Sequence, residues 1–169
     1  KTRLAPHLTR EQRANLVIGM LRRVLGALRG ASIEMIWVVG GDWRVRNVAR
    51  NFGSVWVEEL GRNLNDTLGK AFDRVFERQH SALYLAGDLP FLKPSDLHSL
   101  LGASRRRNNI TLAPARRDGG TNAILVPFGL PFRPELGSRS FTRHLTQAAN
   151  MEISVAICYS PGLGFDLDI

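Results

Sequence analysis

Short apolar segments alternate with longer segments of helical character along this chain, and this alternation constrains the fold more than any other feature. The apolar segments are rich in strand-forming residues and lie at 33–39, 54–59, 82–86, 110–115, 121–126 and 153–159. Helical spacing or helix-start residues separate most of them, at 9–30, 42–53, 63–76, from 95 onward and at 138–150. Thr9 and Gln12 resemble a capping box for the first helix, and Asn63 or Asn65 can cap the third. Strands that alternate with helices of roughly ten to twenty residues are typical of βαβ units. The sequence therefore predicts an α/β fold of three layers around a mostly parallel central sheet.

The length of 169 residues predicts a single domain covering residues 1–169. Cys158 is the only cysteine, which excludes an internal disulfide and favours a reducing, cytoplasmic location. No apolar stretch approaches the ~20 residues that span a bilayer, so no membrane partner is expected. The chain starts directly before a helix and stops in the strand-like segment 163–169. We therefore expect a first strand upstream of Lys1 and a continuation after Ile169.

The net charge of +8 suits polyanionic partners such as nucleotides, phosphorylated metabolites or nucleic acid. The basic residues are scattered, and neither zinc-finger spacing nor a ribonucleoprotein motif accompanies them. Nucleic acid is therefore the less favoured of these partners.

A single carboxylate follows the third apolar segment. Residues 82–86 read as a buried strand, which breaks at Gly87 and presents Asp88 immediately before Leu89 and Pro90. Open α/β folds bind ligands at the carboxyl ends of their strands, so Asp88 is a candidate metal ligand. The alternative is an ordinary turn residue.

Two glycine-containing segments are candidates for phosphate binding. The turn Asp118–Gly120 lets the backbone approach a ligand closely, and Thr121 offers a hydroxyl where the next strand begins. Gly137 and Ser140 fall at the expected start of a helix, where free N–H groups and the helix dipole favour an anion. Taken alone, the first segment is better explained as an ordinary tight turn, and the second would be an unremarkable helix cap.

The last segment contains Asp166 and Asp168, which alternate along the expected strand and so point to opposite faces. Only one of them is expected to join Asp88 in a site. Two carboxylates completed by phosphate oxygens and water are the oxygen-only ligands that Mg²⁺ prefers.

His144 is a weaker candidate for a general base. It follows Arg143 on the expected helix and has no evident nucleophile beside it. The sequence favours a position on the surface, or behind the residues that contact a ligand.

Six segments in one order together resemble a known family. They are "KTRLAPHLT" (1–9), "LNDTL" (64–68), "LAGDLPFLKPSDL" (85–97), "APARRDGGTNAILV" (113–126), "GSRSFTRHL" (137–145) and "PGLGFDLD" (161–168). Over essentially the whole chain they are similar to the 2-phospho-L-lactate/phosphoenolpyruvate guanylyltransferase family of coenzyme F-420 biosynthesis. That family belongs to the MobA-like nucleotidyltransferases, so the resemblance implies a Rossmann-like fold of the GT-A type.

The resemblance implies a role for each matching residue. Asp88 and Asp166 would hold Mg²⁺. The acceptor phosphate would bind four residues around the turn and the later helix start: Gly120, Thr121, Gly137 and Ser140.

The resemblance also implies a nucleotide site. Lys1 would meet the GTP triphosphate and act with Asp88 in catalysis, while Asn65 and Gly87 would lie near the nucleotide. The chain departs from the family in having Asn63 where a glycine is common, which leaves the base contacts open. It also lacks the family's first strand, its proline-lysine loop, and the Thr-Pro that usually follows the last Asp.

The implied reaction needs no strong base. An anionic phosphate oxygen of the acceptor attacks the α-phosphorus of GTP, and pyrophosphate leaves, so alignment and charge neutralisation suffice. The expected partners are GTP and either phosphoenolpyruvate or 2-phospho-L-lactate, with a homodimer allowed. The Arg- and Leu-rich composition favours phosphoenolpyruvate, because it is typical of bacterial chains. The alternatives are a nucleotidyltransferase with a molybdopterin or sugar phosphate acceptor, and a basic nucleic-acid-binding module.

Overall fold

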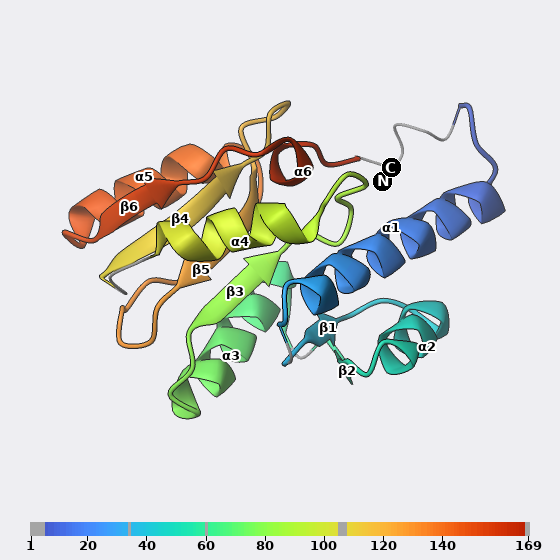
Figure 1. Cartoon of the computed structure of the whole chain (residues 1–169), viewed down its shortest axis with the longest axis horizontal. Helices are drawn as coiled ribbons and strands as arrows, with labels where there is room; N and C mark the ends of the chain where they lie inside the picture. Colours follow the sequence, from blue (N-terminus) through green and yellow to red (C-terminus); the bar gives the residue numbers. More distant parts are fainter. Residues whose placement is uncertain (1–5, 34, 60, 105–107, 168–169) are drawn as a thin grey trace.

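A computed structural model describes residues 6–33, 35–59, 61–104 and 108–167 (Figure 1). Within these residues helices and strands alternate as predicted. The elements are α1 (Arg10–Gly30), β1 (Trp37–Val39), α2 (Trp43–Asn51), β2 (Val55–Val57), α3 (Leu64–Glu77), β3 (Ala82–Leu85), α4 (Pro94–Ala103), β4 (Asn109–Pro114), β5 (Thr121–Val126), α5 (Ser140–Asn150), β6 (Ser154–Ile157) and α6 (Pro161–Gly164). No helix in this part of the chain is long and apolar enough to cross a membrane.

Local residue chemistry explains where several helices begin. Thr9 Oγ1 accepts from the Gln12 N–H at 3.2 Å and Gln12 Oε1 accepts from the Thr9 N–H at 2.9 Å, which confirms the predicted capping box of α1. Asn63, rather than Asn65, caps α3. α4 has Pro94 in its first turn, where a missing N–H does no harm.

The strands form two groups. β1 and β2 make a parallel pair, and the other strands make a sheet in the order β3-β5-β4-β6. In that sheet β3, β4 and β6 run in one direction, as predicted, while β5 runs against both of its neighbours. The connection between β4 and β5 spans only residues 115–120. A parallel crossover needs a dozen or more residues, so this short connection requires the reversal, and the sheet is mixed.

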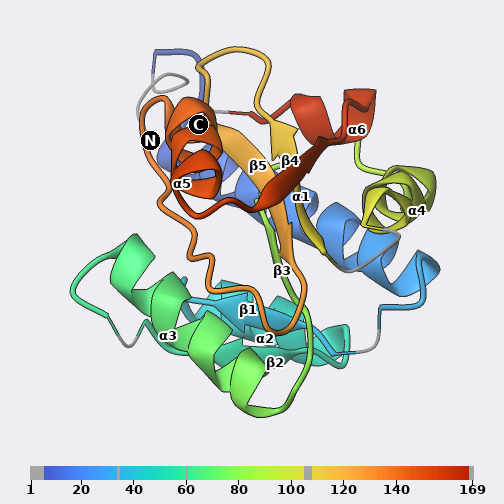
Figure 2. The same ribbon diagram turned by 90° about the vertical axis from the view of Figure 1, so that its left-hand side faces the viewer.

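The elements stack in three layers, with α5 and α3 on one side of the strands and α4 and α1 on the other (Figure 2). Side chains of β5 alternate between the two cores that result. Ala123 packs with the apolar faces of α1 and α4, whereas Ile124 and Val126 pack with those of α3 and α5. Cys158 is buried in the first of these cores, as expected for a small apolar side chain.

The C-terminal segment corrects one expectation. The predicted strand at 163–169 is absent from its described part, since α6 occupies Pro161–Gly164 and Phe165–Leu167 pair with no strand. Ser160 caps α6 by accepting from the Leu163 N–H at 3.0 Å. A proline at the first helical position and a serine before it favour a helical turn over an extended strand.

Candidate active site

The end of β3 and the start of β5 lie at the same edge of the sheet. Leu85 is opposite Ala123 in the antiparallel pair, and the Ala86 N–H donates to the Asn122 carbonyl at 2.8 Å. Asp88 follows β3 by three residues, and Thr121 opens β5. The segments that contain Asp88 and Thr121 therefore reach one edge of the sheet.

Asp166 is brought to this edge by contacts on both sides of it. The Leu167 N–H donates to the backbone carbonyl of Asp88 at 3.0 Å. The side-chain amide of Asn122 donates to the Leu163 carbonyl at 2.9 Å and to Asp166 Oδ1 at 3.3 Å. The structure thus brings together the two predicted metal ligands, called here the carboxylate pair (Asp88 and Asp166).

Burial and the negative charge of the carboxylate pair both affect the pKa of the nearby Tyr84 hydroxyl. Burial raises the pKa of the Tyr84 hydroxyl, and the negative charges of Asp88 and then Asp166 raise it further. Both carboxylates are half-buried, so each keeps a face open to solvent. A concentrated negative charge at an accessible sheet edge is the environment in which a cation binds.

The donor set fits Mg²⁺. Carboxylate oxygens are its preferred protein ligands, and it usually keeps several waters or takes phosphate oxygens from a substrate. Among the residues that the structure describes, no cluster of three or more His, Cys, Asp or Glu side chains could hold a metal ion. Asp168 lies outside the described residues. An ion held by the carboxylate pair would therefore need substrate or water oxygens to complete its coordination.

A second group of polar side chains lies where β5 meets α5, and we call it the hydroxyl–imidazole cluster (Thr121, Ser140 and His144). Ser140 Oγ donates to Thr121 Oγ1 at 3.2 Å, although nineteen positions separate these residues. His144 Nδ1 lies 3.0 Å from the same Thr121 oxygen. All three residues are buried, with exposed fractions of 6%, 1% and 0%. The structure thus brings together the two hydroxyls predicted to receive a phosphate.

The glycine-rich turn packs against the start of α5. The Phe141 N–H donates to the Gly119 carbonyl at 3.1 Å, and the Gly120 N–H donates to Asp118 Oδ1 at 2.8 Å. Asp118–Gly120 is therefore a tight turn, as the simpler alternative proposed, and it also adjoins the second predicted phosphate segment. Arg139, the residue before α5, has a left-handed backbone and makes no side-chain cap.

His144 is not at the surface, and this corrects one of the two positions considered for it. Its Nε2 accepts from the Glu135 N–H at 2.8 Å. Burial, together with the positive charge of Arg143, lowers the pKa of His144 to about 4. The imidazole is therefore neutral near pH 7. Its one free lone pair is already engaged, so it supports its neighbours rather than acting as a base.

The segment that carries Gly137 is held from two sides. Arg143 donates to the Ser138 carbonyl at 2.6 Å and to the carbonyls of Glu135 and Leu136 at 3.0 and 3.2 Å. From α3, Asn65 donates to the Leu136 carbonyl at 3.1 Å and accepts from the Leu136 N–H at 2.8 Å.

The predicted nucleotide residues are less closely grouped. Asn65 lies beside the Gly137 segment, with its amide oxygen and one amide proton bonded to Leu136. Gly87 is exposed, and a side chain there would meet nothing within 4 Å. Lys1 lies outside the described residues. The structure thus places Asn65 against the segment that carries Gly137, while Gly87 stays beside Asp88.

Sequence reasoning missed two supporting side chains, Asn122 and Tyr84. Asn122 directly follows Thr121, and side chains alternate between faces along a strand. Strict alternation would place Thr121 on the face of Ala123 and Asn122 on the face of Ile124, which is the reverse of what their contacts show. The pairing of β4 with β5 shifts register here, with Pro114 opposite Thr121, and this irregularity is what turns Thr121 toward α5 and Asn122 toward Asp166. One builds the hydroxyl–imidazole cluster and the other steadies the carboxylate pair.

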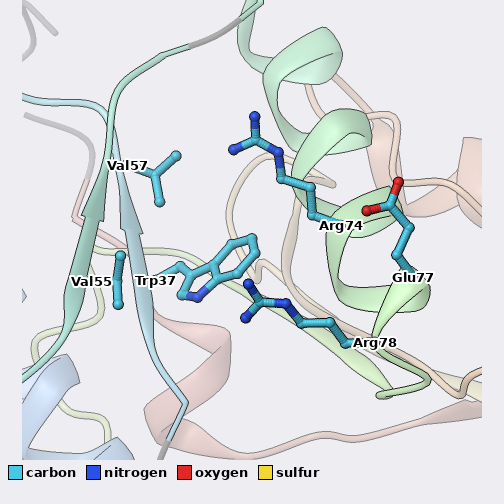
Figure 3. Close-up of a pocket in the computed structure, with 6 residues that line it drawn as sticks. All are labelled: Trp37, Val55, Val57, Arg74, Glu77 and Arg78. Carbon is cyan, nitrogen blue, oxygen red and sulfur yellow. The ribbon is translucent and has the colours of Figure 1, made fainter.

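A separate hollow of about 450 Å³ opens between the β1–β2 pair and α3 (Figure 3). Its lining consists of Trp37, Val55, Val57, Arg74, Glu77 and Arg78. The Arg78 guanidinium lies 5.6 Å from the centre of the Trp37 ring. None of the predicted site residues lines this hollow.

Comparison with known proteins identifies relatives of the whole chain. The family model described as "Guanylyl transferase CofC like" matches residues 1–169. A phosphoenolpyruvate guanylyltransferase of Rubrobacter xylanophilus is 37% identical, covering 99% of this chain and 82% of the relative. A 3-phospho-D-glycerate guanylyltransferase of Phenylobacterium zucineum is 34% identical over 99% of this chain and 79% of the relative. A 2-phospho-L-lactate guanylyltransferase of Methanocaldococcus infernus is 30% identical over 99% and 74%.

The fold has counterparts among solved structures. A crystal structure from Desulfovibrio desulfuricans G20, described as a nucleotide-diphospho-sugar transferase, matches with a TM-score of 0.74 at 15% identity. The match covers 92% of this chain and 71% of that one. The predicted nucleotidyltransferase-type α/β fold is thereby confirmed.

Acidification is expected to weaken the fold through His144. Its pKa is about 4 in the folded chain, against 6.5 for a free histidine, so the unfolded chain takes up the proton first. The contribution of His144 is complete above about pH 6.5 and is lost as the pH falls toward 4, by roughly 3 kcal/mol in all. Urea unfolding between about pH 7 and pH 4.5 measures this loss.

Two variants isolate that contribution. His144→Asn should show a shallower pH dependence of the free energy of unfolding, while His98→Asn, at an exposed position on α4, should retain the wild-type slope. Equal slopes in wild type and His144→Asn would contradict the assignment.

Proposed function

Because the chain belongs to the family of CofC-like guanylyl transferases, we propose that it transfers GMP from GTP to a small phosphorylated carboxylic acid and releases pyrophosphate. Phosphoenolpyruvate and 2-phospho-L-lactate, named for two relatives, are the proposed acceptors. A third relative is named for 3-phospho-D-glycerate, which therefore joins the acceptors to be tested. The proposal includes a place in coenzyme F-420 biosynthesis and a cytoplasmic location.

The observation that carries this proposal is that two neighbouring residues, Thr121 and Asn122, connect the hydroxyl–imidazole cluster to the carboxylate pair. Thr121 belongs to the hydroxyl–imidazole cluster, and its neighbour Asn122 donates to the carboxylate pair through Asp166. A phosphate held by the hydroxyls would thus lie near a cation held by the carboxylates. Phosphoryl transfer requires this combination of alignment and charge neutralisation.

The proposed chemistry forms one bond and breaks one. An oxygen of the acceptor phosphate bonds to the α-phosphorus of GTP, and the bond from that phosphorus to the bridging oxygen of the β-phosphate breaks. The bonding electrons leave with pyrophosphate. The attacking oxygen is already anionic, so no residue has to remove a proton from it. A bound Mg²⁺ would neutralise charge on the phosphates.

The chain's own residues position the reactants. Thr121 and Ser140 would hold the acceptor phosphate at the start of α5, where the helix has no side-chain cap and its dipole favours an anion. Gly120 and Gly137 would let the phosphate approach the backbone. Asp88 and Asp166 would hold the ion.

Three further residues are proposed to bind GTP. Lys1 would meet the triphosphate, and Asn65 and Gly87 would lie near the nucleotide. The net charge of +8 favours both substrates, because both are polyanions.

The direct test is an assay of the full-length protein with GTP, Mg²⁺ and each of the three acceptors in turn. Pyrophosphate release should require an acceptor and should be fastest with one of these three acids. Release without any acceptor, or only with a sugar phosphate, would contradict the proposal and favour a different nucleotidyltransferase.

Asp88→Asn should abolish turnover and leave the melting temperature close to that of the wild type. The amide keeps the shape of the side chain but loses the charge that would hold the ion. Asp73→Asn removes the same charge from an exposed position on α3, where Asp73 pairs with Arg133, and should retain activity. A large fall in melting temperature for Asp88→Asn would instead support a turn residue needed for folding.

Thr121→Val should raise the KM for the acceptor by roughly ten- to a hundredfold, because a hydrogen bond to a charged group is worth about 1.5–3 kcal/mol. The KM for GTP should change little, since the guanosine half binds elsewhere. Thr111→Val, at an equally buried position on β4, is the matched control. Equal rises in both KM values would show that Thr121 does not contact the acceptor.

A further inference from the structure

We propose that His144 is a positioning residue that turns a hydroxyl proton of the Thr121–Ser140 pair outward, toward the acceptor phosphate. This inference rests on the proposed function, because it assigns the phosphate to that pair. The hydrogen bonds of the hydroxyl–imidazole cluster determine which atom of His144, Thr121 and Ser140 carries each proton.

The tautomer of His144 is determined by the backbone. A backbone N–H can only donate, and the Glu135 N–H lies 2.8 Å from His144 Nε2. Nε2 must therefore be unprotonated, and in a neutral imidazole the proton then sits on Nδ1. The pKa of about 4 keeps the ring neutral near pH 7. His144 Nδ1 is thus a donor to Thr121 Oγ1, at 3.0 Å.

The direction of this bond decides how many protons the pair can offer to a ligand. Thr121 and Ser140 have two hydroxyl protons, and their mutual bond at 3.2 Å uses one of them. Because Nδ1 donates, the other hydroxyl proton is not needed within the cluster. With the opposite tautomer, Thr121 would donate to Nδ1 and Ser140 to Thr121, so no proton would remain for a ligand.

A phosphate dianion makes this difference decisive, because its oxygens accept hydrogen bonds and carry no proton to donate. The cluster must therefore supply the donor, and the Glu135–His144 bond ensures that it does. The Phe132 ring, whose centre lies 5.8 Å from that of the imidazole, packs beside it and limits its rotation. The result is a donor oriented before the substrate arrives.

Two substitutions separate the two nitrogen atoms of His144. Asn places an amide near the position of Nδ1, so it can donate to Thr121 but does not reach Glu135. Gln reaches the position of Nε2, so it can accept from the Glu135 N–H but leaves no donor at Nδ1. Phe preserves the ring and removes both bonds.

We expect His144→Gln and His144→Phe to raise the acceptor KM about tenfold or more, as for the loss of one hydrogen bond to a charged group. His144→Asn should stay within about threefold of the wild type, because the donor is retained. The KM for GTP should be unchanged in all three variants. Steady-state assays with the best of the three acceptors measure these values.

Urea unfolding of the same variants provides a readout that distinguishes positioning from support. His144→Asn leaves the Glu135 N–H without its partner and should be less stable than His144→Gln. For His144→Asn and His144→Gln, the order of stability is therefore expected to be opposite to the order of acceptor binding, while His144→Phe should be low in both. A side chain needed only for folding would give the same order in both measurements.

The outcomes distinguish the positioning role of His144 from the proposed function on which it rests. An acceptor KM that follows stability, or that no variant changes, would overturn the role of His144 while guanylyl transfer by the wild type still supports the proposed function. Failure of the wild type to release pyrophosphate with any of the three acceptors would overturn the proposed function, and this inference with it.

Discussion

The reversal of β5 against β3 and β4 is the constraint on which the candidate site depends. The short connection at 115–120 forces this reversal, so β5 begins, rather than ends, at the edge where β3 stops. The first two residues of β5, Thr121 and Asn122, therefore lie at the edge of the sheet that Asp88 follows. A register shift in the pairing with β4 turns Thr121 toward α5 and Asn122 toward Asp166, so one dipeptide serves both halves of the site.

Burial requires the polar atoms of Thr121, Ser140 and His144 to keep their hydrogen-bond partners. A buried polar group without a partner costs several kcal/mol, so Thr121, Ser140 and His144 are stable inside the protein only as a bonded set. The set is anchored to Glu135, whose segment Arg143 holds from within α5. Such a network stays in one arrangement in the absence of a ligand, which is what a phosphate site of defined shape requires.

The carboxylate pair, in contrast to the buried hydroxyl–imidazole cluster, is partly open to solvent. Asp88 and Asp166 are only half-buried, and their negative charges add to the effect of burial in raising the pKa of Tyr84. The solved structure from Desulfovibrio desulfuricans G20 shares the scaffold at 15% identity, which is evidence for the fold alone. The activity has to be argued from the side chains placed on that scaffold. Here those side chains are an acidic pair next to a hydroxyl pair.

The sequence by itself determined the features that depend on near neighbours. Periodicity and turn chemistry act over a few residues, so three features could be predicted from the sequence. They are the alternation of strands and helices, the capping box at Thr9 and the position of Asp88 at the end of a strand. Only the tertiary structure decided the burial of His144, its bond to Thr121 and the pairing of Asn65 with Leu136. These contacts join residues 23 and 71 positions apart, and no local pattern records which distant segment a side chain will meet.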